Sequence, residues 1–150
     1  MRGLITGLAL ATLALSACSD QRGMAANGKI CADFKLAKAA PPGASADAIA
    51  VDECARRWAY SLAPSRDDAD MVAEAVVGAC NASLTRWNQQ ALSQPGAEST
   101  SASLTTGEPT TPLAEHNSFA HARALLYVVQ ARAGNCAPPG VVNGAPEGVS

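Results

Sequence analysis

Hydrophobic residues between positions 51 and 87 recur at steps of three and four, the period of a helix that buries one face. The first stripe lies in a predicted helix over residues 46–63 and consists of Val51, Cys54, Trp58 and Leu62. The second stripe lies beyond Pro64 and consists of Val72, Val76, Cys80, Leu84 and Trp87. Because each stripe contains a cysteine, both thiols are expected to face inward. The pattern predicts an antiparallel helical hairpin.

Local residues set the ends of these two helices. Ser45 is a suitable N-cap for the first helix, and Pro64 ends it because the proline ring clashes with the preceding turn. Ser65 or Asp67 caps the second helix, which is predicted to run to about Leu92. The acidic residues at its start complement the helix dipole and lack the spacing of a calcium-binding loop.

Charged pairs on the first helix are predicted to brace its solvent-exposed face. Asp52 precedes Arg56 by four residues, and Glu53 precedes Arg57 by four. Exposed pairs of this kind stabilise a helix by only about 0.3–0.5 kcal/mol each. Neighbouring acids point in different directions on a helix, which disfavours a shared catalytic role.

A further helix is predicted from Pro112 to Ala133, with Thr111 as its cap. Its apolar stripe consists of Phe119, Ala122, Leu126, Val129 and Ala133. This helix either completes a bundle with the hairpin or acts as a partner-binding arm, and Cys136 just beyond it favours the first alternative. In the first case Leu126 is expected to be buried.

The remaining segments differ from these helices in composition. Ile30 and Phe34 suggest a short helix that ends before Pro41. Residues 93–111 are rich in Ser, Thr and Pro and are predicted to form a flexible linker within a helical domain over residues 29–136. The Pro/Gly-rich tail over residues 137–150 is expected to be disordered.

The amino terminus has the pattern of an export signal. Residues 4–15 form an apolar run that follows Arg2, too short for a transmembrane helix of about 20 residues. The run ends in Leu15-Ser16-Ala17-Cys18, which resembles the lipobox of bacterial lipoproteins. The resemblance implies a signal peptide over residues 1–17, lipidation of Cys18, and a lipidated tether over residues 18–28. Ser19 in place of aspartate favours the outer membrane over the inner.

The other four cysteines are predicted to form two disulfides, since an exported chain matures in an oxidising compartment. Three pairings are open. The hairpin favours Cys54–Cys80, which leaves Cys31–Cys136 by elimination. No Cys-x-x-Cys occurs, and His116 and His121 lie five residues apart, so they cannot share one metal ion on a helix. We therefore expect no metal site and no cofactor.

Together these features predict an all-α fold, a small disulfide-stapled bundle of three to four helices. The combination of Cys54, a break over residues 64–67, and Ala79-Cys80 resembles small exported helical-hairpin proteins of bacteria that have no assigned activity.

The sequence also narrows the class of function. A formal net charge of −2 and an aromatic content of 4% argue against nucleic-acid binding. No nucleophile elbow, phosphate loop or metalloenzyme motif occurs, so an enzyme is not expected. We expect a lipid-anchored, periplasm-facing binding or structural module, with membrane lipid and an envelope protein as partners. The alternative is an envelope effector such as an enzyme inhibitor, an immunity factor or a lysis accessory protein.

Overall fold

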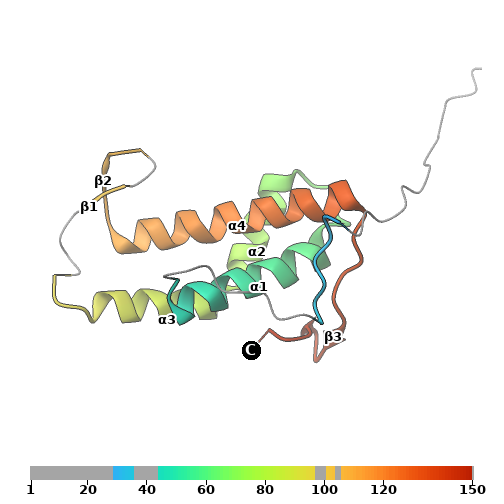
Figure 1. The fold of residues 1–150 in the computed structure, drawn as a ribbon, viewed down its shortest axis with the longest axis horizontal. Helices are drawn as coiled ribbons and strands as arrows, with labels where there is room; N and C mark the ends of the chain where they lie inside the picture. The colour runs from blue at the N-terminus through green and yellow to red at the C-terminus, as the bar shows by residue number, and fades with distance from the viewer. Residues whose placement is uncertain (1–28, 36–43, 97–100, 104–105, 150) are drawn as a thin grey trace, which may run out of the picture.

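The computed structural model describes residues 29–35, 44–96, 101–103 and 106–149. Most of these residues lie in four helices: α1 (Ala46–Leu62), α2 (Ala69–Ala79), α3 (Asn81–Leu92) and α4 (Pro112–Gly134) (Figure 1). Two antiparallel hairpins are formed by short strands: β1 (Ser101–Ala102) with β2 (Pro109–Thr110), and β3 (Val141–Val142) with β4 (Ala145–Pro146). The predicted signal peptide, Cys18 and tether lie outside the described residues. Within the described ranges, no helix combines the length and hydropathy needed to cross a membrane.

Helix α1 begins where the sequence predicts. The Ser45 hydroxyl accepts a hydrogen bond from the backbone N–H of Ala48 at 3.1 Å, which satisfies one of the free donors of the first turn. The helix ends at Leu62, just before Pro64. Its inward face includes Val51 and Tyr60, both fully buried. The N-cap and the position of this helix are confirmed.

The second predicted helix is in fact two helices. The helical path breaks at Cys80, which has φ −95° and ψ 10° and separates α2 from α3. Cys80 is also bonded to Cys54, with a Cα–Cα distance of 5.8 Å. A straight helix from Asp67 would leave the two cysteines offset along the hairpin, and the bend at the bonded residue brings them within the distance that a disulfide requires.

Helix α4 contacts each of the other three helices (Figure 1). It runs in the same direction as α1, because Arg123 contacts Asp52 and Arg132 contacts Ala63. It runs opposite to α3, as the contact between His116 and Asn88 shows together with Figure 1. The helix is therefore an integral part of the fold and not a free arm.

The face of α4 that is buried differs from the predicted one. Its buried residues are Ala120, Ala124, Tyr127, Val128, Ala131 and Gly134. Leu126 and Val129 are 50% and 51% exposed, so the prediction that Leu126 is buried was wrong. The apolar pattern was misleading because half of the buried residues are alanine, whose small side chain gives a weak hydrophobic signal. Leu126 and Val129 lie on the exposed side of the same helix.

The amino-terminal segment is not helical in its described part. Residues 29–35 form turns, so the short helix predicted from Ile30 is wrong over this range. The segment is instead held by contacts to α1: the Tyr60 hydroxyl accepts a hydrogen bond from Ala32 N at 2.9 Å, and Phe34 packs edge-on against the Tyr60 ring. The fourth helix of the fold thus arises from the break at Cys80.

The carboxyl-terminal tail was expected to be disordered, but it is folded back onto α1. Asn143 and Gly144 both have positive φ values, 52° and 81°, and form the turn between β3 and β4. Pro146 is buried, and the Glu147 carbonyl accepts a hydrogen bond from the Arg57 guanidinium at 2.6 Å. Asn-Gly is the preferred dipeptide of such turns, so this hairpin had a sequence signal that the composition obscured. Part of the 93–111 segment also pairs, through β1 and β2.

The structure joins the two cysteine pairs that the sequence favours. The S–S distance is 2.05 Å for Cys54–Cys80 and 2.11 Å for Cys31–Cys136. The bonds close loops of 26 and 105 residues. By loop-closure entropy they stabilise the fold by about 3.5 and about 5 kcal/mol respectively.

Substitutions on α4 distinguish its buried face from its exposed one. Val128→Ala removes fully buried methyl groups and should lower the free energy of unfolding by about 2 kcal/mol. Leu126→Ala removes more carbon but should cost less than about 1 kcal/mol, because the side chain is half exposed. Chemical denaturation of both variants measures the difference. An equal or larger loss for Leu126→Ala would contradict the observed orientation of α4.

Candidate functional site

A buried polar network joins α1 to α4. The Asp52 carboxylate accepts hydrogen bonds from Arg123 Nε at 2.5 Å and from the Tyr127 hydroxyl at 2.8 Å. Arg123 also donates to the Tyr127 hydroxyl and lies over the Tyr127 ring, 4.8 Å from its centroid. Asp52 as a residue is only 7% exposed. The prediction that Asp52 pairs with Arg56 on a solvent face was therefore wrong.

The attraction between Arg123 and its partners keeps the guanidinium charged. Burial disfavours the charged form of Arg123, but the hydrogen bond that it donates to Asp52 and its attraction to Tyr127 and Asp52 outweigh this effect, so the pKa of Arg123 is raised above its ordinary value. The guanidinium remains charged under all physiological conditions. The group acts as a fixed positive partner for Asp52 and is unsuited to proton transfer.

A second set of charges lies one turn further along α1. Arg56 is 5% exposed and pairs with Glu53 at 2.6 Å, whereas Arg57 lies 3.9 Å from the same carboxylate. Both guanidinium groups lie against the Phe34 ring, at 5.0 and 5.3 Å from its centroid. These arginines fasten the amino-terminal segment to α1 through cation–π contacts. The predicted Glu53–Arg57 pair is therefore present, but both arginines pack against Phe34 and do not brace an exposed face.

A hollow of about 660 Å³ lies beside this cluster, between the amino-terminal segment and the carboxyl-terminal tail. Its charged lining residues are Asp33, Lys35, Arg57 and Glu147. The charges of these two acids and two bases cancel, so the hollow favours neither an anionic nor a cationic ligand. The Arg57 side chain donates through Nη1 to the Glu147 carbonyl, while its buried Nε has no hydrogen-bond partner.

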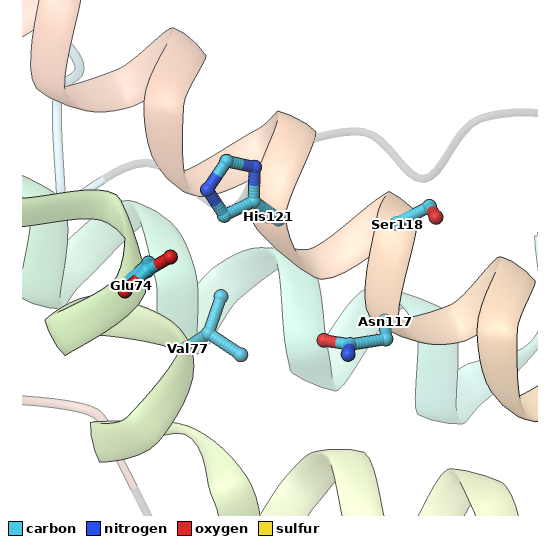
Figure 2. A pocket seen from close by; sticks show the side chains of 5 residues that line it. All are labelled: Glu74, Val77, Asn117, Ser118 and His121. Carbon is cyan, nitrogen blue, oxygen red and sulfur yellow. The ribbon is translucent and has the colours of Figure 1, made fainter. Parts of the chain in front are cut away.

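A different hollow, of about 460 Å³, lies between α2 and α4 (Figure 2). It is lined by Glu74, Val77, Asn117, Ser118 and His121. Figure 2 shows Glu74 and Val77 on α2, and His121 on α4 on the same side of the hollow as Glu74. His121 Nε2 lies 3.3 Å from the Asp70 carboxylate. Among the described residues, Asp70, Glu74 and His121 form the group that could hold a metal ion, with ligand atoms within 4.8 Å of one another.

Sequence reasoning missed this group. Asp70 and Glu74 are spaced one helical turn apart, which was a usable signal. The third member, His121, comes from a distant helix whose orientation was wrongly predicted.

The other histidine has a different environment. The His116 ring stacks on Trp87 with centroids 3.6 Å apart and planes 12° apart, and its Nδ1 lies 2.8 Å from Asn88 Oδ1. Burial lowers the pKa of His116 below its ordinary value of 6.5. The two histidines therefore serve separate contacts between α4 and its neighbours, as their spacing predicts.

Comparisons of the chain with protein-family models, with curated proteins and with solved structures found no match. Of the predicted site residues, Cys31, Cys54, Cys80 and Cys136 are paired in disulfides, and Cys18 lies outside the described ranges. In the described part of the chain, the group of side chains that could hold a metal ion lies at the α2–α4 hollow.

The depressed pKa of His116 predicts a pH-dependent stability. As the pH falls from about 7 to about 5, the unfolded chain takes up a proton on this imidazole before the folded chain does, which lowers the free energy of unfolding. His116→Phe keeps an aromatic ring against Trp87 and should reduce that loss. Denaturant titrations at both pH values measure it, and groups common to both proteins cancel in the comparison. An unchanged pH dependence would show that His116 is not responsible.

Proposed function

We propose that the protein is a lipoprotein, anchored through Cys18 and facing the periplasm from the outer membrane, whose helical domain is a non-catalytic binding or structural module. The lipobox-like run Leu15-Ser16-Ala17-Cys18 supports the anchor. The two disulfides support export, because such bonds persist in oxidising compartments. The disulfide pairing carries most weight: it accounts for every cysteine except the one in the lipobox.

The Cys31–Cys136 bond determines which end of the domain is connected to the proposed membrane anchor. Cys136 follows the end of α4, so the bond fixes that end of the helix to the segment that contains Cys31. A fully extended chain from Cys18 to Cys31 spans at most about 45 Å. The bonded end of the domain would therefore be held within about 45 Å of the membrane. The amino-terminal end of α4 lies about 35 Å from the bonded end, since the helix has 23 residues.

The outward face of α4 supports a role in binding. It exposes Leu126 and Val129, one turn apart, with exposed alanines at positions 122 and 133. The opposite face is occupied by α1, α2 and α3, so this strip is not needed for folding. An apolar strip on a polar surface is suited to a partner protein, and we propose a protein of the envelope as that partner. Within the same proposal, α1 and the α2–α3 segment form an antiparallel hairpin that α4 completes as a bundle.

The pairing of the buried charged groups supports the proposal that the module is not catalytic. Asp52 is matched by Arg123 and Tyr127, and Glu53 by Arg56, so these groups contribute to packing between segments. Neither set requires a substrate to balance its charge.

The anchor is tested by metabolic labelling. Wild-type protein expressed in a bacterial host should incorporate labelled fatty acid and fractionate with membranes, because two or more acyl chains hold a protein stably on a bilayer. Cys18→Ala should lose both properties. Ser16→Thr in the lipobox serves as a mild control that keeps the nucleophilic thiol. Undiminished labelling of Cys18→Ala would refute the proposed anchor.

The binding surface is tested by photo-crosslinking in intact cells. A photoreactive residue at position 126 should give one discrete adduct with another envelope protein, and the same residue at exposed Arg86 on α3 should not. The adduct should disappear when Cys18→Ala releases the domain from the membrane. An adduct with the mass of two copies of this chain, or equal adducts from both positions, would contradict the proposed partner surface.

A further inference from the structure

Three metal-ligating side chains from two helices converge at the edge of the α2–α4 hollow. Asp70 and Glu74 lie on α2, one turn apart, and His121 reaches toward them from α4 (Figure 2 shows Glu74 and His121). Their ligand atoms all lie within 4.8 Å of one another. The cluster therefore combines two carboxylates with an imidazole that belongs to a separate structural element.

The distance between His121 and Asp70 matches the geometry of a bound ion. Two ligand atoms that each lie about 2.0–2.1 Å from a tetrahedral zinc ion are about 3.4 Å apart. His121 Nε2 and the Asp70 carboxylate oxygen are 3.3 Å apart. Two of the three ligands are thus spaced as an ion would require. Glu74 is exposed, and its ligand atom already lies within 4.8 Å of the other two.

Electrostatics also favour a cation between these groups. Two carboxylates one helical turn apart repel each other, and one imidazole cannot neutralise both. A divalent cation balances the two negative charges and satisfies the histidine nitrogen at the same time. The hollow beside the cluster has room for water ligands, and Asn117 and Ser118 line it with further polar groups.

We propose that Asp70, Glu74 and His121 bind a first-row divalent metal ion of the zinc class. The imidazole nitrogen selects such ions over magnesium and calcium, which prefer oxygen ligands. The remaining coordination positions are filled by water. An ion bound there joins α2 directly to α4, a connection that neither disulfide makes. It therefore acts as a third cross-link of the fold.

The test is zinc binding to the full-length protein in detergent, after treatment with a chelator and with both disulfides intact. Calorimetric titration with Zn²⁺ should show one site per chain. His121→Gln and Asp70→Asn should each weaken it by at least about tenfold, since even loss of an indirect partner of a metal ligand typically costs 10–100-fold. All variants retain Cys18, so the difference reports the cluster.

Two controls make the result specific. His116→Gln removes the other histidine of the chain and should leave zinc affinity unchanged. Saturating Zn²⁺ should raise the melting temperature of the wild type by at least about 5 °C, because the ion links two helices of the folded state, and it should not stabilise His121→Gln. Absence of saturable binding, or equal zinc affinity in wild type and His121→Gln, would overturn the proposal.

Discussion

Close packing of alanine between α1 and α4 is the constraint on which the rest of this structure depends. Both helices face one another with small side chains: the buried residues include Ala55, Ala59, Ala124 and Ala131. Small side chains let helix axes approach closely, but each removes little apolar surface from water. At about 25 cal/mol per Å² of buried apolar area, such an interface stabilises the fold less than one built from leucine or phenylalanine. The molecule therefore depends on other interactions to stay folded.

Those interactions are covalent and polar. One disulfide joins α1 to the junction of α2 and α3, and the other closes the end of the domain where the first and last segments meet. Tyr60 and Tyr127, the largest side chains of the core, bring hydroxyl groups that bond to the amino-terminal segment and to Asp52. A buried ion pair is rarely a strong source of stability, since desolvation offsets its attraction. The Asp52–Arg123 pair does hold one particular face of α1 against one particular face of α4. The small alanine side chains alone would specify this orientation poorly.

The sequence predicted the features that depend on local chemistry. Ser45 and Pro64 bound the first helix because capping and ring sterics act within a few residues, and the disulfides followed from the inward position of two thiols. What failed depended on tertiary contacts. The buried face of α4 was misassigned because alanine carries little hydropathy, and the burial of Asp52 depends on a partner 71 residues away. The bend at Cys80 and the meeting of His121 with α2 likewise required the packed structure.

The nested order of the two disulfides has a consequence for biogenesis. In the export route that we propose, Cys31 would be the first of the four paired cysteines to leave the translocation pore and Cys136 the last, while Cys54 and Cys80 pair between them. An oxidant that joins cysteines in the order of their emergence would link Cys31 to Cys54 and trap the chain in a non-native form. Correct maturation therefore requires Cys31 to remain a thiol until the last helix has emerged, or an isomerase to exchange the early bond. Maturation of this domain should accordingly depend more on isomerase activity than that of exported proteins whose cysteines pair consecutively.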